Sequence, residues 1–359
     1  MPTTATTDAA PAGRLAGGWR TTAAFAGVTA LSMVATLVLM CLLPHSDYLR
    51  YIRADETQQY PKTRWIYERI HFDPTPIDVA FFGSSRTGGA IQTAIVEEAL
   101  AREGIAAHAV NFNLPQMGRN LHYALVKELL ESRDVPVIVL EVTEIAERHL
   151  HPQFSTIADA GDILEAPVIG NLRYARDLVA LPGRQLDLFL RSLPQTVGLE
   201  PAPRFEPGQY AGANLDRGDV LIDAEGNRKS RDRTMPEAEL RAAARRFQAG
   251  IDDPLLPEAL AEVEFGANRF YIRRIIALAR AHGTRLVFLY LPSFGAPPEP
   301  AERSVWGGAG PVLTVHPLVQ ESHLWLDETH VNWTGSQIVS RALGPMLAPY
   351  VRPDLDGTP

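Results

Sequence analysis

Two short motifs lie far apart in this chain and together carry the residue types of serine-dependent acyl chemistry. The first is Gly83-Ser84-Ser85-Arg86-Thr87-Gly88, and the second is Asp327-Glu328-Thr329-His330. A serine hydroxyl is a weak nucleophile at neutral pH unless a base accepts its proton, and a carboxylate must hold that base in the correct tautomer. On one tight turn, Asp327 can meet Nδ1 of His330 and leave Nε2 free. We therefore predict Ser85 as the nucleophile, His330 as its base and Asp327 as the orienting carboxylate.

Each motif has a plainer explanation when it is taken alone. The two serines could simply cap a helix, and the aspartate and histidine could be surface turn residues. The first motif does not fit the G-x-S-x-G elbow of α/β-hydrolases, because Thr87 stands where the second glycine would be. It does not fit a phosphate-binding loop either, because no G-K-[ST] follows. The motifs gain meaning only as a pair, and Ser84 stays open as an alternative nucleophile.

Alternating strands and helices are expected to position the two motifs. Short apolar runs predict buried strands, and stretches with helical periodicity separate most of them. This alternation is typical of parallel βαβ units and predicts a three-layer α/β/α domain, in which both motifs follow or border the carboxyl ends of strands. The predicted strands are 77–82, 107–112, 135–140, 285–291 and a short one at 322–326, and the predicted helices are 90–102, 120–132, 268–281 and 334–347.

The rest of the chain divides around this α/β domain, which we place at 76–350. Residues 150–265 break the strand–helix alternation and carry Pro-punctuated helical pieces at 172–193 and 236–248. We interpret them as a mostly helical insertion or cap. Residues 1–20 and 351–359 are predicted to be tails, the first of them disordered, and residues 47–75 a linker.

Residues 21–46 contain no acidic or basic side chain and predict a transmembrane helix. The apolar stretch from Ala23 to Leu43 is just long enough to cross a hydrocarbon core of about 30 Å. A cleaved signal peptide and a buried core helix remain alternatives. Basic residues flank both ends of the span, so the charge rule does not decide its orientation. The layout of a short tail, one span and a long domain favours a single-pass protein of a bacterial inner membrane with its domain on the periplasmic side.

The motifs resemble those of the SGNH/GDSL hydrolase superfamily, in particular its membrane-anchored type that acts on cell-surface polysaccharides. Gly83-Ser84-Ser85 corresponds to the first block, G-D-S, and Asp327 with His330 corresponds to the last block, D-x-x-H. The segment from Asn111 to Asn120 is similar to the second block. The third block, G-x-N-D, has no counterpart, because Glu141-Val142-Thr143-Glu144 stands there.

The resemblance implies a flavodoxin-like fold and a serine-dependent esterase or O-acyltransferase that transfers a group, commonly acetyl, on a cell-surface glycan. It implies an oxyanion hole built from the N–H groups of Ser85 and Gly118, with Asn113 or Asn120 donating a side-chain amide. No metal or organic cofactor is required. A membrane acyl donor or a polysaccharide-assembly component would be the protein partner. The missing third block keeps a second reading open, a non-catalytic component that binds glycan or protein in such a system.

Other features carry weaker expectations. Arg86 is predicted either to bind an anionic substrate group or to pair with an acidic neighbour, and Trp333 either to stack on a sugar ring or to pack in the core. His149 and His151 lie near several glutamates, but a solvated loop explains them better than a metal site. The net charge of −8, from 34 basic and 42 acidic residues, argues against a nucleic-acid partner. One cysteine, Cys41, excludes an internal disulfide.

Overall fold

The computed structural model describes residues 14–56, 62–201, 203–207, 220–222, 228–251 and 254–352. Helix α1 begins at Arg14, so residues 14–20 belong to a helix, and the predicted tail is wrong there; residues 1–13 lie outside the described residues. At the other end, Val351 still belongs to α14 (Trp333–Val351), and residues 353–359 lie outside the described part.

Five parallel strands form the central sheet. They are β1 (Val79–Phe82), β2 (Ala109–Asn111), β3 (Val137–Val142), β6 (Arg285–Tyr290) and β7 (Val312–Thr314), in the spatial order β2-β1-β3-β6-β7. In register, Val79 of β1 pairs with Val137 of β3, and Val137 pairs in turn with Arg285 of β6. Strands buried on both faces read as continuous apolar runs, and the prediction of a parallel α/β sheet is confirmed.

The predicted strand at 322–326 is wrong. Ser322–Leu324 is a turn of 3-10 helix, and Trp325 makes only an isolated antiparallel bridge to Val331. The apolar pattern there comes from burial of the Trp325 indole, whose N–H donates to the carbonyl of Val319 at 2.8 Å, and not from sheet pairing. The edge position belongs to β7, which the sequence analysis does not foresee.

Helices pack on both faces of the sheet. The side chains of Ala80 and Phe82 point to one face and join a core with α6 (Arg119–Ser132) and α12 (Gly266–Ala281). The alternate residues Val79 and Phe81 join a second core with α5 (Thr93–Arg102) and α14. The period-two alternation of strand side chains thus separates two apolar cores.

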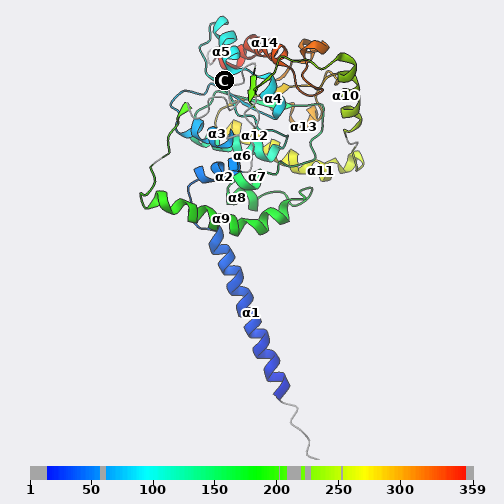
Figure 1. The fold of residues 1–359 in the computed structure, drawn as a ribbon. Coiled ribbons are helices and arrows are strands. Elements are labelled where there is room, and N and C mark those ends of the chain that lie inside the picture. Colours follow the sequence, from blue (N-terminus) through cyan, green and yellow to red (C-terminus); the bar gives the residue numbers. More distant parts are fainter. Residues whose placement is uncertain are drawn as a thin grey trace, which may run out of the picture.

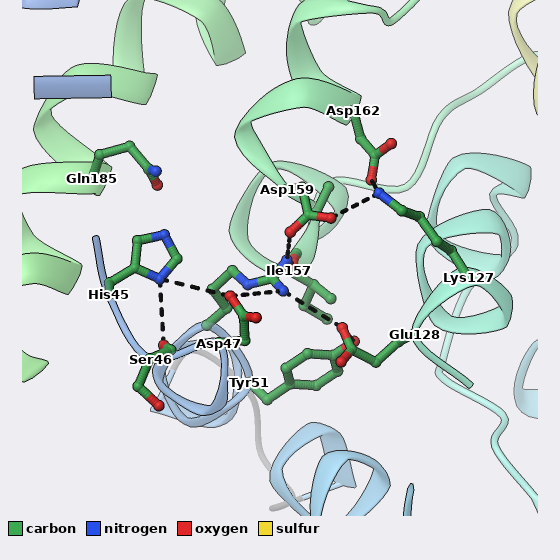
Figure 2. A network of polar contacts seen from close by, with 12 residues as sticks. His45, Ser46, Asp47, Tyr51, Lys127, Glu128, Ile157, Asp159, Asp162 and Gln185 are labelled. Carbon is green, nitrogen blue, oxygen red and sulfur yellow. Dashed lines mark hydrogen bonds and ion pairs between the residues drawn. The ribbon is translucent and has the colours of Figure 1, made fainter. Parts of the chain in front are cut away.

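The described residues of 47–75 are not a linker, which corrects the prediction. They form α2 (Tyr48–Glu56) and α3 (Lys62–His71), and Tyr51, Ile66 and Ile70 are fully buried in the first core. The guanidinium of Arg50 in α2 is buried and surrounded by three carboxylates. Arg50, only 3% exposed, lies 2.7 Å from Asp159, 3.2 Å from Asp47 and 3.5 Å from Glu128 (Figure 2). A buried charge paired in this way is compatible with a core helix.

Among the described residues of 150–265, helices predominate, and one small antiparallel strand pair lies beside them. The helices that were predicted at 172–193 and 236–248 correspond to α9 and α10. The elements are α7 (Phe154–Ile157), α8 (Ala160–Leu164), α9 (Tyr174–Thr196), β4 (Val220–Ile222), β5 (Arg228–Ser230), α10 (Glu237–Ala249), a 3-10 turn (Glu258–Leu260) and α11 (Ala261–Glu264).

Helix α1 (Arg14–Cys41) projects away from the rest of the chain (Figure 1). Within it, Gly18–Cys41 is long and apolar enough to cross a membrane, and none of its most apolar window is buried inside the protein. A core helix would be covered by other elements, so its exposure argues against that alternative.

Candidate active site

Ser85 lies where β1 gives way to a short helix at the carboxyl edge of the sheet. After Gly83, Ser84 caps α4 (Ser85–Ala90), and its Oγ accepts a hydrogen bond from the N–H of Arg86 at 3.1 Å. Ser85 is therefore the first residue of the helix, and it is half-buried. An abrupt strand-to-helix turn of this kind presents a hydroxyl at the sheet edge, where sites form in parallel α/β proteins.

Three side chains from the two motifs converge at this turn. Nε2 of His330 lies 2.8 Å from Oγ of Ser85, and Nδ1 of His330 lies 2.9 and 3.0 Å from the two carboxylate oxygens of Asp327. The carboxylate fixes the proton on Nδ1, which leaves Nε2 as an acceptor for the serine hydroxyl. The chain thus brings together the three residues that the sequence analysis paired.

The turn that holds Asp327 and His330 is fixed by its own hydrogen bonds. Oδ1 of Asp327 accepts from the backbone N–H groups of Thr329 and His330, both at 2.9 Å. The N–H of Leu326 donates to the carbonyl of His330 at 2.9 Å and closes the loop. Asp327 therefore shapes the loop as well as orienting the imidazole.

The surroundings of Asp327 keep its carboxylate ionised. Partial burial acts to raise its pKa, but hydrogen bonding from His330, the electrostatic attraction to His330 and two hydrogen bonds from Thr329 outweigh it and lower the pKa to about 2. A charged carboxylate at this position can stabilise the imidazolium that forms when His330 accepts a proton.

Glu141, at the end of β3, accepts hydrogen bonds from the turn that carries Ser85. This role was not predicted from the sequence. The carboxylate of Glu141 is 1% exposed and accepts from the N–H and the hydroxyl of Ser84, both at 2.7 Å. It also accepts from the N–H of Thr87 at 3.1 Å and from the Thr87 hydroxyl. A buried acid at the end of β3 therefore holds the residues on both sides of Ser85.

These bonds leave one backbone donor of the turn unused. The N–H groups of Ser84 and Thr87 donate to Glu141, and that of Arg86 donates to the Ser84 hydroxyl. Among the described residues, no acceptor is found for the N–H of Ser85. An unpaired N–H in the first turn of a helix is a ready donor for an oxyanion.

The second predicted block contributes residues with different surroundings. Both polar atoms of the Asn120 amide are hydrogen-bonded to the backbone of His151. Nδ2 donates to the carbonyl of His151 at 3.1 Å, and Oδ1 accepts from the N–H of His151 at 2.8 Å. Gly118, which precedes α6, packs closely against His151. A Cβ added at Gly118 would lie 2.5 Å from the backbone nitrogen of His151. Asn120 thus ties the loop together, and this engagement argues against its predicted role as an oxyanion donor.

Asn113 is placed beside the nucleophile turn, because the N–H of the next residue, Leu114, donates to the carbonyl of Gly83 at 3.1 Å. The side chain of Asn113 is 2% exposed, and its Oδ1 has no hydrogen-bond partner within the part of the chain that the structure describes. Buried amides are normally satisfied. Its Nδ2, the atom that could donate to an oxyanion, also makes no hydrogen bond among the described residues, so of the two asparagines predicted for the oxyanion hole Asn113 is the one whose amide stays available.

Arg86 and Trp333 both have partners within the protein. The buried guanidinium of Arg86 forms a two-point pair with Glu144 at 2.8 and 3.0 Å and donates to the carbonyl of Leu291 at 3.0 Å. This is the second of its two predicted roles, pairing with an acidic neighbour. The guanidinium of Arg231 lies over the ring of Trp333, 5.7 Å from the ring centroid. One face of the indole is therefore already in contact with a cation of the protein itself.

The two histidines near the glutamates differ in their surroundings. Nε2 of His151 lies 2.8 Å from the carbonyl of Pro115, and its Nδ1 accepts from the N–H of Gln153 at 3.1 Å, whereas His149 is exposed. Across the ranges that the structure describes, no group of three or more His, Cys, Asp and Glu side chains is arranged to hold a metal ion.

Comparison with known proteins adds no relative to this picture. The chain matches no protein-family model, and no curated protein sequence matches it significantly. The geometry around Ser85 is what bears on function.

Proposed function

We propose that this protein is a serine-dependent esterase or O-acyltransferase that works through an acyl-enzyme. The observation that carries the proposal is the alignment of Ser85 Oγ, His330 and Asp327 at hydrogen-bond distances. A nucleophile, a base and an orienting carboxylate in this order are the requirements for activating a serine hydroxyl.

In the first half-reaction, Oγ of Ser85 attacks the acyl carbonyl and its proton passes to Nε2 of His330. The bond from the acyl carbon to the leaving oxygen then breaks, and His330 returns the proton to that oxygen. In the second half-reaction, water or a sugar hydroxyl gives its proton to His330 and attacks the carbonyl of the acyl-serine. The bond from the acyl carbon to Oγ of Ser85 then breaks, and His330 returns the proton to Oγ. Water yields hydrolysis, and a sugar hydroxyl yields transfer.

The developing oxyanion requires donors at the site. The unused N–H of Ser85 supplies one, and the side-chain amide of Asn113 and the N–H of Gly118 are the further donors that we propose. One well-placed donor is worth about 10²–10³ in rate. We assign Glu141 no donor role, because both of its carboxylate oxygens accept hydrogen bonds from the turn.

The arrangement of the sheet is consistent with an SGNH-type domain. Taken in chain order, its strands follow the flavodoxin-like sequence 2-1-3-4-5, with helices on both faces. Ser85 follows β1, which lies second in that order. We therefore propose the three-layer SGNH-like architecture, with residues 150–265 as its insertion.

We further propose that α1 anchors the domain in a membrane, with the site on the extracytoplasmic side. The length and exposure of Gly18–Cys41 support this. The resemblance of the motifs suggests acetyl as the transferred group, a cell-surface glycan as the acceptor or substrate, and a membrane acyl donor or assembly component as partner.

The test uses the full chain in detergent with a small acyl ester, p-nitrophenyl acetate, and a fluorophosphonate probe. We expect the wild type to hydrolyse the ester and to be labelled, and Ser85→Ala to lose both while unfolding at the same denaturant concentration. The adjacent Ser84→Ala is the matched variant and should keep the label, although it loses two hydrogen bonds of the turn. Undiminished turnover in Ser85→Ala would overturn the assignment, and an unlabelled wild type would favour the non-catalytic binding component.

A further inference from the structure

The exposed large hydrophobic residues gather in one part of the molecule. Among the described residues that follow Leu42, they fall in only two stretches, 164–199 and 255–263. The stretches touch, since Gly170 lies against the carbonyl of Val263, and a groove of about 630 Å³ lies between them. We call this set the basal apolar surface; its members are Leu164, Val168, Ile169, Leu172, Val179, Leu190, Leu193, Val197, Leu199, Leu255, Leu260 and Val263.

Helix α9 is the longest element that contributes to this surface. Val179, Leu186, Leu190 and Leu193 are spaced by seven, four and three residues and therefore lie along one face of the helix. Val179 is 81% exposed. The opposite face is buried against the protein through Leu181 and Leu188. A surface helix normally turns polar side chains outward, so this outward apolar stripe calls for an apolar neighbour.

The stripe lies where α1 leaves the rest of the protein. Figure 1 shows α9 lying across the end of α1, as the outermost element on that side. The two helices contact each other, and Nε2 of Gln185 donates to the carbonyl of Cys41, the last residue of α1, at 3.4 Å. Because α2 starts at Tyr48, only a few residues separate the end of α1 from the folded domain. A bilayer spanned by α1 would have its surface at the level of α9.

We propose that α9 and the basal apolar surface lie in the interface of the lipid bilayer, as a second membrane contact beside α1. The partner is the bilayer itself, because the stripe continues from the end of the spanning helix and runs across its axis, as an interfacial amphipathic helix does. The contact would hold the domain, and with it Ser85, in one orientation above the membrane. The inference rests on the proposed anchoring by α1.

Spin labels on the full chain test this contact. Cys41 is the only cysteine, so Cys41→Ser gives a background in which single cysteines at Val179, Leu190, Val34 and Glu98 can each carry a nitroxide. Val34 reports on α1. Glu98, exposed on α5 at the far end of the domain from α9 (Figure 1), is the matched control. Each protein is reconstituted into vesicles of phosphatidylethanolamine and phosphatidylglycerol, and collisions with oxygen and with a water-soluble nickel chelate on both sides are measured.

We expect the ratio of oxygen to nickel collisions to be several-fold higher at Val179 and Leu190 than at Glu98, and higher still at Val34. Labels at Val179 and Leu190 that meet nickel as freely as Glu98 would overturn the inference. Labels there that are shielded from both reagents would also overturn it, in favour of a protein partner. Nickel access at Val34 would mean that the anchoring itself fails, whereas lipid-embedded Val34 with water-exposed α9 labels would refute only the interfacial contact.

Discussion

The buried carboxylate of Glu141 accepts hydrogen bonds from both the backbone N–H and the hydroxyl of Ser84, each at 2.7 Å. Ser84 is the neighbour of the proposed nucleophile, and Thr87 on the following turn donates to the same carboxylate. The acidic side chain thus fixes the backbone on both sides of Ser85 from β3. The backbone N–H groups of Ser84, Arg86 and Thr87 all have acceptors within the protein. The N–H of Ser85 has none among the described residues, and in our proposal it donates to the oxyanion.

Replacing Glu141 with glutamine should weaken this support. The amide of Glu141→Gln has one acceptor oxygen and sets its NH₂ group against donors of the turn, so at least one buried donor loses its partner. A buried donor left unpaired costs about 1–3 kcal/mol. We expect the free energy of unfolding, measured in urea, to fall by that amount, together with ester turnover. Glu98→Gln, which changes an exposed glutamate, should leave both unchanged; an unaltered urea midpoint in Glu141→Gln would contradict the role.

Asp327→Asn should reduce turnover far more than it reduces stability. An asparagine amide favours the wrong imidazole tautomer, and in the Ser-His-Asp enzymes that define this chemistry the same change lowers kcat by about 10⁴. The Oδ1 atom of asparagine can still accept the N–H groups of Thr329 and His330 that shape the loop. Steady-state kinetics with p-nitrophenyl acetate and a thermal unfolding scan separate the two effects. The adjacent Glu328→Gln serves as the control, and equal turnover in both variants would argue against the triad.

The apolar runs in the sequence were sufficient to predict the strands at the centre of the sheet. The runs at 77–82, 135–140 and 285–291 correspond to β1, β3 and β6 because a strand covered on both faces needs consecutive apolar residues. The edge strand β7 has only three residues, all half-buried, and carries no such pattern. Helix α2 carries no long apolar run, and its Arg50 is buried against Glu128 and Asp159, which are distant in the sequence.

The site was predictable to the extent that its residues lie in paired motifs. Ser85, Asp327 and His330 could be associated because a serine nucleophile needs the other two groups. Nothing in the sequence indicated that Glu141 points back to the turn after β1, or that Glu144 pairs with Arg86. Those contacts depend on β1 and β3 being neighbours in the sheet, which becomes clear only in three dimensions.

Gly118→Ala should disturb the loop that borders the site. A Cβ at this position would lie 2.5 Å from the backbone nitrogen and the Cβ of His151, so the loop must shift. Overpacking of this kind costs about 1–3 kcal/mol. Gly161→Ala, in α8, is the matched control because a Cβ there meets nothing within 4 Å. We expect a lower Tm and lower turnover in Gly118→Ala and no loss in Gly161→Ala. Identical Tm values would show that the contact with His151 relaxes without cost.

The pH dependence of stability should carry the signature of Glu147. Its side chain lines a small cavity beside the end of β3 together with Arg119 and Glu302. Burial raises its pKa to about 7, although the charge of Arg119 acts to lower it. Between the ordinary glutamate pKa of about 4.3 and this value, the folded protein binds a proton that the unfolded chain does not. Stability therefore falls as the pH rises through this window.

Glu147→Gln removes the titrating group and with it this pH-dependent loss. The variant should gain stability relative to the wild type as the pH rises from about 4.3 to the folded-state pKa of about 7 and keep that gain above it. Urea unfolding at the two ends of the window measures the difference. Gln337→Ala, which replaces an uncharged side chain, should shift the midpoint equally at both ends. A difference between Glu147→Gln and the wild type that stays constant across the window would mean that Glu147 is ionised in the folded protein, with Arg119 compensating its burial.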